Sequence, residues 1–356
     1  MRVLTVVGAR PQFIKAAPVS RILRQHHHEF LVHTGQHYDD AMSDLFFRQL
    51  GIPAPDVNLG IGSGSHGEQT GAMLPAIESV VLEQRPDCLL VYGDTNSTLA
   101  GALVGAKLHV PVVHVEAGLR SYDRRMPEEV NRVVADHLST LLLCPTETAV
   151  RNLAKEGLTK GVAVTGDVML DAFLQHAKIA RESAETVSSL GLSKGGYALV
   201  TVHRAENVDD PAVLARVIRG VNESRRRAVF PVHPRTRKAL ATADIQPAEN
   251  VRLIDPVGYL EMLVLEEGAG VIVTDSGGVQ KEAYFAGRPC VTLRETTEWT
   301  ETVAAGWNVL VGSNPEEIAR AIREFRPDGA RPNLFGDGHA SERVVEALSG
   351  VESTNP

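Results

Sequence analysis

The chain has 356 residues, which is long for a single hydrophobic core, so its length predicts two domains of ordinary size. Hydrophobic residues make up 43% and charged residues 22%, a composition typical of a globular protein. The net charge of −8 excludes binding to nucleic acid through a basic surface, and no apolar run of 18 residues suggests a membrane span.

The three cysteines, Cys88, Cys144 and Cys290, lie far apart in the sequence, each beside an apolar run. Because their number is odd and no CxxC pair exists, they give no disulfide framework. We expect small buried residues in a reduced cytosol. The strand-like start of the chain leads straight into Gly8 and does not have the pattern of a signal peptide, so we expect a cytoplasmic protein.

Short apolar and β-branched runs alternate with helical stretches, which predicts parallel sheets built from βαβ units. The first series of predicted strands is 3–7, 29–34, 88–92, 112–115, 140–144 and 162–165. One open sheet is expected to end near Gly166, and a largely helical connection follows over 167–194. The second series is 198–202, 229–232, 251–254, 271–274 and 290–293. Two such sheets predict a cleft where the carboxyl ends of their strands face each other, because ligands bind beyond those ends.

The first strand leads into Gly8 and a helix that contains Arg10 and Lys15. A glycine turn at a helix N-terminus offers amide donors and the helix dipole, and with two cations nearby this pattern predicts an anion site. The alternative is a plain strand-to-helix turn with a solvated arginine.

Carboxylates follow the next strands. Asp94 comes after a strand and could instead cap the following helix. Glu116 also stands at a strand end, where a carboxylate is costly to desolvate unless it has a task or a partner. Pro127 suits a first helical turn, with Glu128 and Glu129 behind it where acids are favourable anyway. We interpret Glu129 as ordinary helix-start charge and leave both interpretations of Glu128 open.

In the second half, His203 and His233 each follow a strand. A lone histidine there is more often structural, but two such loops in one sheet favour a functional role. After a later strand, the run Asp275-Ser276-Gly277-Gly278 allows backbone amides to close around a phosphate. Glu282, one turn into the next helix, is placed to accept hydrogen bonds from ribose hydroxyls.

Two other patterns favour an ordinary explanation. The segment 62–67 fits G-x-G-x-x-G, but no convincing strand precedes it, so we expect a polar loop rather than a dinucleotide site. The run His26-His27-His28 lies at a helix end without partner ligands, so we expect solvated surface rather than a metal site. The sequence has no P-loop, HExxH motif or nucleophile elbow, and we expect no metal.

Taken in order, these motifs closely resemble the non-hydrolysing UDP-N-acetylglucosamine 2-epimerases over nearly the whole chain. The matching segments are Gly8-Ala9-Arg10-Pro11, Gly93-Asp94-Thr95-Asn96-Ser97, His114-Val115-Glu116-Ala117-Gly118-Leu119-Arg120, Pro127-Glu128-Glu129, His203-Arg204, Asp275-Ser276-Gly277-Gly278 and 336–340. The resemblance implies an α/β protein with the GT-B fold, in which two Rossmann-like parallel-sheet domains flank a deep cleft. The expected divisions are 1–166, 167–338 and a C-terminal helix, 339–356, that packs back on the first domain.

The resemblance also implies a homodimer that interconverts UDP-GlcNAc and UDP-ManNAc. The C2 proton has no adjacent carbonyl, so direct deprotonation would give an unstabilised carbanion. Instead UDP leaves C1 as the C2 proton is removed, giving 2-acetamidoglucal, and returns while C2 is protonated on the opposite face. This reaction needs cations and amides for the diphosphate and acid/base groups around the sugar, but no cofactor or metal.

The family's functional residues can be carried over by position. Asp94, Glu116 and Glu128 match the catalytic carboxylates, and we expect Glu116 and Glu128 to act on opposite faces of C2 while Asp94 positions or assists. His203 is expected to act beside the diphosphate and is included in the catalytic set. The expected substrate-binding residues are Arg10, Lys15, Arg132, His233, Ser276, Gly277, Gly278 and Glu282, with Glu282 at the ribose.

The chain departs from the family pattern at three places. Gln12 stands where many members have Glu, and Glu298-Trp299-Thr300-Glu301 replaces a frequent Glu-Arg-Pro-Glu. The stretch 36–40 lacks the Gln-His-Arg-x-Met segment that helps to hold an activating sugar in some members, so hyperbolic kinetics are expected.

Rival interpretations keep the fold and change the chemistry. One is a 2-epimerase of a related UDP-sugar such as UDP-2,3-diacetamido-glucuronate, and another is a hydrolysing enzyme that releases ManNAc and UDP. A GT-B glycosyltransferase would need an acceptor site in the first domain rather than three carboxylates at strand ends. A non-catalytic nucleotide-sugar sensor would not need those acids.

Overall fold

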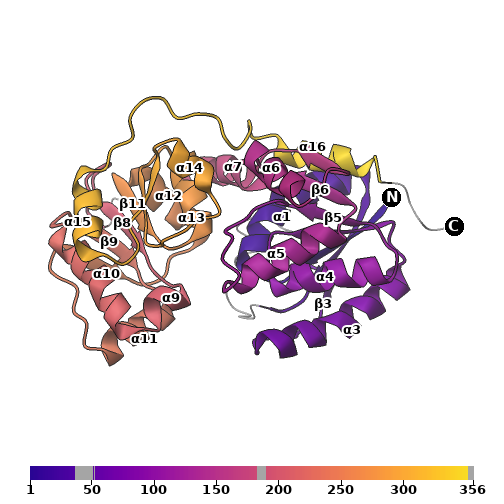
Figure 1. The fold of residues 1–356 in the computed structure, drawn as a ribbon, viewed down its shortest axis with the longest axis horizontal. Helices are drawn as coiled ribbons and strands as arrows, with labels where there is room; N and C mark the ends of the chain where they lie inside the picture. The colour runs from indigo at the N-terminus through magenta and orange to yellow at the C-terminus, as the bar shows by residue number, and fades with distance from the viewer. Residues whose placement is uncertain (37–50, 52, 183–189, 352–356) are drawn as a thin grey trace. The chain divides into compact units, whose positions relative to one another are not determined.

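The computed structural model describes residues 1–36, 51, 53–182 and 190–351. By its internal contacts the chain forms two compact units, Met1–Leu174 with Phe335–Pro356, and Gln175–Leu334. Each unit has one parallel sheet with helices packed against it, as the alternation of strands and helices predicts (Figure 1).

The sheet of the first unit has seven strands in the order β3-β2-β1-β4-β5-β6-β7, and all its pairings are parallel. The strands are β1 (Arg2–Val7), β2 (His28–His33), β3 (Val57–Asn58), β4 (Cys88–Tyr92), β5 (Val112–Val115), β6 (Leu141–Cys144) and β7 (Val162–Val164). The chain adds β2 and β3 on one side of β1 and β4 on the other. The edge between β1 and β4 is therefore the switch point, where open α/β sheets bind ligands.

The helices of the first unit are α1 (Arg10–His26), α3 (His66–Gln84), α4 (Asn96–Lys107), α5 (Pro127–Leu138), α6 (Glu147–Lys155) and α16 (Ala340–Leu348), with α7 (Val168–Glu182) crossing from this unit into the second. Every residue of β4 is buried, because helices cover both faces of the sheet. Gly101 in α4 allows close packing, since a Cβ there would lie 2.9 Å from Val91.

The sheet of the second unit has six parallel strands in the order β10-β9-β8-β11-β12-β13. They are β8 (Ala198–Thr201), β9 (Ala228–Pro231), β10 (Val251–Ile254), β11 (Val271–Thr274), β12 (Cys290–Thr292) and β13 (Asn308–Leu310). The helices are α9 (Ala205–Val208), α10 (Pro211–Glu223), α11 (Pro234–Thr242), α12 (Tyr259–Gly268), α13 (Gly277–Phe285), α14 (Thr300–Ala304) and α15 (Pro315–Glu324). Its switch point lies between β8 and β11.

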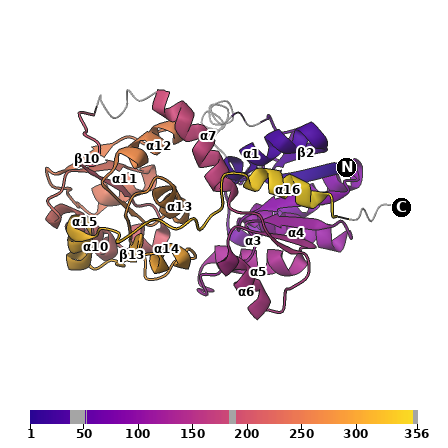
Figure 2. The same cartoon turned by 90° about the horizontal axis from the view of Figure 1, so that it is seen from above.

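All the strands expected from the sequence are present, with ends shifted by a residue at most, while β3 and β13 were not expected. The boundaries between the units differ from those expected. Residues 167–174 and 335–338 belong to the first unit. The reason is local bonding: Asp167 N donates to the Phe335 carbonyl (2.9 Å), and the Asp171 carboxylate accepts from the backbone amides of Ala340 and Ser341. These bonds bring α16 to the first unit, where it packs against α1 (Figure 2).

Candidate active site

The amides of the turn after β1 are hydrogen-bonded to the side chain of Gln12. The Gln12 Oε1 atom accepts from Gly8 N (2.8 Å) and Ala9 N (3.1 Å), and its Nε2 atom donates to the Tyr92 carbonyl (3.0 Å). A Cβ at Gly8 would lie 2.0 Å from Thr34 Oγ1, so the turn requires glycine. Gln12 therefore takes up these two amides, and the anion site expected at this helix N-terminus stays a prediction. The Arg10 side chain lies outside the described residues.

Lys15 was also expected near a bound anion, but it pairs with a carboxylate of the protein itself. Its Nζ lies 2.5 Å from Glu116 Oε1, and both side chains are nearly buried. Glu116 follows β5 with a left-handed φ of 71°, a conformation that is costly for a residue with a side chain and is often found at functional sites. Gly93 lies next to this ion pair, since a Cβ at Gly93 would be 3.0 Å from Lys15 Nζ and 3.4 Å from Glu116 Oε1.

Asp94 follows Gly93 at the end of β4, next to β5 in the sheet. The cap of α4 is Thr95, whose hydroxyl accepts from Thr98 N, so Asp94 is not the helix cap. Its carboxylate is hydrogen-bonded to the buried guanidinium of Arg132. Two proposed catalytic carboxylates, Asp94 and Glu116, therefore end adjacent strands, and each is paired with a cation.

Helix α5 brings Glu128, Glu129 and Arg132 to the same region. Glu128 is half-buried in the first turn, four residues before Arg132 and on the same side of the helix. Glu129 is not the ordinary helix-start charge that the sequence suggested. It is 2% exposed and accepts from the backbone amides of Ser121 and Tyr122 (both 2.9 Å) and from Arg132 Nη1 (2.5 Å). Burial would raise the pKa of Glu129, but these bonds and the arginine charge outweigh it and lower the pKa.

Beneath these carboxylates lies a buried polar cluster that the sequence analysis did not single out. The Asp136 carboxylate accepts from Arg120 Nη1 (2.6 Å) and Gly118 N (3.1 Å), and its other oxygen lies 2.7 Å from His114 Nδ1. Arg120 also binds Glu156 with two nitrogens (2.6 and 2.7 Å). The HVEAGLR run contains His114 and Arg120 as well as Glu116. The same motif therefore supplies a proposed catalytic acid and two residues of the buried polar cluster.

In the second unit, one buried carboxylate organises the loop that carries His203. Asp275 accepts from His203 N (3.0 Å), Arg204 N (3.0 Å) and Asn207 Nδ2 (3.1 Å), and it is fully buried. His203 follows β8 and Asp275 follows β11, so these bonds cross the switch point. The His203 ring stays partly exposed, with its centroid 6.3 Å from that of His233.

His233 caps α11, because its Nδ1 atom accepts from Arg235 N (3.2 Å), which leaves Nε2 to carry the proton of a neutral ring. Partial desolvation, followed by the charges of His203 and Arg235, lowers the pKa of His233. Neutral imidazole is therefore the favoured form of His233 near neutral pH.

The expected phosphate loop lies at the start of α13. Ser276 is the helix cap and accepts from Val279 N, and Gly277 and Gly278 form the first turn. A Cβ at Gly277 would lie 2.2 Å from Glu298 Oε1, so a side chain at this position would clash. The loop therefore brings bare backbone to a helix N-terminus at the switch point, which suits a phosphate.

Glu282, further along α13, is 5% exposed and faces a second acid, Glu266 of α12, which is fully buried. Burial, then the neighbouring Glu282 carboxyl, raises the pKa of Glu266 well above its ordinary value. Burial and the neighbouring carboxyl therefore both favour the protonated form of Glu266.

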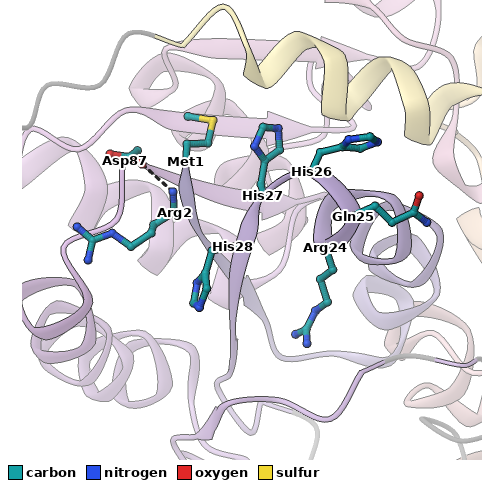
Figure 3. A pocket seen from close by; sticks show the side chains of 8 residues that line it. All are labelled: Met1, Arg2, Arg24, Gln25, His26, His27, His28 and Asp87. Atoms are coloured by element: carbon teal, nitrogen blue, oxygen red, sulfur yellow. Dashed lines mark hydrogen bonds between the residues drawn. The ribbon is translucent and has the colours of Figure 1, made fainter.

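A surface pocket of about 500 Å³ lies at the opposite, amino-terminal end of β1 and β2, away from these residues. It includes His26, His27 and His28, whose rings point in different directions (Figure 3). Within the described ranges, no group of three or more His, Cys, Asp or Glu side chains is placed to hold a metal ion. The candidate site residues of each unit therefore lie at the carboxyl edge of that unit's own sheet rather than at this pocket.

The profile of the family described as UDP-N-acetylglucosamine 2-epimerase matches residues 21–349. The chain belongs to this family. It is 54% identical over 99% of its length to the whole of a UDP-N-acetylglucosamine 2-epimerase homolog of Methanococcus maripaludis. It is 49% identical over 98% of its length to 99% of the UDP-2,3-diacetamido-2,3-dideoxy-D-glucuronate 2-epimerase of Pseudomonas aeruginosa.

Among solved structures, the 2-epimerase resembles Methanocaldococcus jannaschii UDP-GlcNAc 2-epimerase in complex with UDP-GlcNAc and UDP. The TM-score is 0.92 and the identity 44%, over 98% of this chain and all of the other. The GT-B fold expected from the sequence is thereby confirmed, and the chain is an isomerase of the epimerase type.

Removal of the Asp275 carboxylate from the 2-epimerase tests its control of the His203 loop. Asp275→Ala leaves three N–H donors without their acceptor, and each such loss costs about 1–3 kcal/mol where the donor is buried. We expect weaker UDP binding by isothermal titration and a lower free energy of unfolding. Asp275→Asn keeps one acceptor oxygen and should lie between Asp275→Ala and the parent protein. UDP binding by Asp275→Ala at the parent affinity would contradict this role.

Glu266→Gln is expected to stabilise the 2-epimerase at neutral pH. The unfolded chain releases this proton near the ordinary glutamate pKa of about 4.3, whereas the folded protein keeps it. Above that pH the folded state binds more protons, so this residue makes stability fall as pH rises. Glutamine keeps a neutral donor beside Glu282 and removes the titration.

The measurement is denaturant unfolding at several pH values, with Glu223→Gln on the surface of α10 as the control. Glu266→Gln should show a smaller loss of stability from acidic to neutral pH, and Glu223→Gln should follow the parent protein. Identical pH profiles for Glu266→Gln and the parent would show that Glu266 is ionised in the folded state.

Proposed function

We propose that this 2-epimerase interconverts UDP-GlcNAc and UDP-ManNAc through elimination and re-addition of UDP. The observation that carries the proposal is a set of acids at the carboxyl edge of the first sheet. Asp94 and Glu116 follow the neighbouring strands β4 and β5, each beside a buried cation, and Glu128 lies in the first turn of α5. The similarity to the M. jannaschii enzyme in complex with UDP-GlcNAc and UDP supports the same substrate.

The chemistry follows from these groups. One carboxylate takes the C2 proton while the C1–O bond breaks, UDP leaves with the bonding electrons, and a C1=C2 double bond forms. UDP then adds back to C1 while an acid on the opposite face protonates C2. We assign Glu116 and Glu128 to the two faces, and Asp94, held by Arg132, to a positioning or assisting role.

The residues of the second unit are assigned to UDP. The Ser276-Gly277-Gly278 turn and His203 take the diphosphate, together with Arg10 of the first unit, and Glu282 takes the ribose hydroxyls. His233 lies beside His203 and completes this group. Charge that develops on the departing diphosphate is then met by amides and cations already in place.

Lys15 has a different role from the one that its sequence position suggested. Because its Nζ is bonded to Glu116, we assign it to holding that carboxylate in place rather than to binding the diphosphate. Arg132 does the same for Asp94 through a guanidinium that Glu129 also holds. Both acids are thus oriented before the sugar arrives.

The decisive experiment is incubation with UDP-GlcNAc in D₂O, followed by NMR. The expected result is deuterium at C2 together with a product of manno configuration. Free ManNAc and UDP would indicate the hydrolysing enzyme instead. Absence of exchange at C2 would contradict the proposal and favour a glycosyltransferase or a sensor.

A second substrate is favoured by the 49% identity to the P. aeruginosa enzyme, whose substrate is a diacetamido-glucuronate. Both UDP-sugars should be compared under one set of conditions. We expect a higher kcat/KM for UDP-GlcNAc. A higher value for UDP-2,3-diacetamido-glucuronate would keep the mechanism and change the substrate.

We also propose a homodimer located in the cytoplasm. Large apolar side chains on the first unit are exposed, among them Leu82 (58%) and Tyr122 (65%), and they are candidates for burial between subunits. Across the described part of the chain, no helix is long and apolar enough to cross a membrane. Light scattering of the purified protein tests the dimer, and cell fractionation tests the compartment.

A further inference from the structure

His114 lies in the middle of the first sheet with both of its ring nitrogens against hydrogen-bonding partners. It is fully buried in β5. Its Nε2 atom is 2.7 Å from the carbonyl oxygen of Gly93, and its Nδ1 atom is 2.7 Å from Asp136 Oδ1. A carbonyl oxygen has only lone pairs to offer, so Nε2 must carry a proton to bond with Gly93.

The partner of Nδ1 is also an acceptor. The other oxygen of Asp136 receives N–H groups from Arg120 and Gly118, and the buried Arg120 guanidinium favours an ionised carboxylate. A bare Nδ1 would place two lone pairs 2.7 Å apart, so Nδ1 carries a proton as well.

The charges around the ring favour this form. With His114 protonated, two cations, His114 and Arg120, balance two anions, Asp136 and Glu156. The neighbouring pair of Lys15 and Glu116 is neutral by itself. With a neutral ring, the four groups would carry one net negative charge, shared with Glu156, whose side chain is 26% exposed and lies 3.8 Å from His137.

We propose that His114 is a buried, doubly protonated imidazolium that positions the Gly93–Asp94 turn. The Gly93 carbonyl is held by His114, and the next carbonyl, that of Asp94, is held by Asn131 Nδ2 (3.0 Å). Two successive peptide groups are thereby fixed at the residue proposed to assist at the sugar. His114 is a positioning residue, and its effect on turnover rests on the proposed function of Asp94.

The protonation state can be measured without substrate, by ¹⁵N NMR of the full chain labelled at histidine. The His114 signals are assigned by their loss in His114→Asn, and His28→Gln on the surface serves as the labelling control. The expected spectrum at neutral pH has both His114 ring nitrogens protonated, with protons that exchange slowly with water. One unprotonated nitrogen would overturn the proposal, whether or not the protein proves to be an epimerase.

Two variants then separate positioning from folding. The amide nitrogen of glutamine can take the place of Nε2 and hold the Gly93 carbonyl, whereas that of asparagine takes the place of Nδ1 and cannot reach it. We expect His114→Gln to keep kcat within about 10-fold, and His114→Asn to lose roughly 10²-fold, the cost of a catalytic group displaced by about 1 Å. UDP affinity should be unchanged in both, because its proposed binding residues lie mostly in the second unit.

Equal kcat values for the two variants, or a fall in UDP affinity that matches the fall in kcat, would contradict a positioning role. Circular dichroism and unfolding of both variants establish that each is folded. If the parent protein shows no exchange at C2, the proposed function fails, and the NMR result still decides the state of His114.

Discussion

Glu116→Gln is expected to lower kcat by roughly 10²–10⁴-fold, the usual contribution of a general acid or base. The amide keeps the size of the carboxylate and an oxygen that can accept from Lys15 Nζ, but it cannot take a proton from C2. UDP binding should change little, because the uridine and most of the diphosphate are assigned to residues of the second unit. Glu128→Gln should behave in the same way on the opposite face of the sugar.

The measurements are steady-state epimerisation and isothermal titration with UDP. The control is Glu147→Gln, which removes an exposed acid from the first turn of α6, whereas Glu128→Gln removes a half-buried acid from the first turn of α5. Glu147→Gln should leave turnover unchanged. A parallel loss of turnover and UDP affinity in Glu116→Gln and Glu128→Gln would mean that these acids are structural.

Asp136→Ala is expected to give the largest loss of stability. The carboxylate is fully buried and serves His114, Arg120 and the Gly118 amide. Removing one partner of a buried ion pair costs about 3–5 kcal/mol, because the remaining charge has no compensation. Denaturant unfolding followed by circular dichroism should show a clear fall in the transition midpoint.

Asp123→Ala is the matched control, because Asp123 pairs with Arg125, whose side chain is 92% exposed. Exposed pairs contribute about 0–1 kcal/mol, so this variant should unfold close to the parent protein. If Asp136→Ala and Asp123→Ala unfold alike, the buried cluster does not stabilise the first unit.

The fold could be predicted from the sequence because the predicted strands are apolar runs of three to six residues between helical stretches. The two strands that were missed, β3 with two residues and β13 with three, are edge strands of their sheets and too short to show any periodicity. The unit boundary was misplaced because it depends on bonds between Asp171 and residues about 170 positions later, which no local pattern reveals.

At the candidate site, the positions of the polar residues could be predicted, but their partners could not. Strand ends located Asp94 and Glu116, whereas the pairing of Lys15 with Glu116 spans 101 residues. The burial of Glu129 depends on a loop in which Tyr122 has a left-handed φ of 60° and turns its amide toward the carboxylate. Residue type and spacing carry no information on such a loop.

The return of α16 to the first unit sets the order in which the nascent chain can be completed. The second unit, Gln175–Leu334, is one continuous segment, so its sheet can form as soon as that segment has left the ribosome. The first unit begins earlier but must wait for residues 335–348, which are translated after the second unit. The surface of α1 that receives α16 therefore stays uncovered while the second unit is made, and the unit begun first is completed after the other.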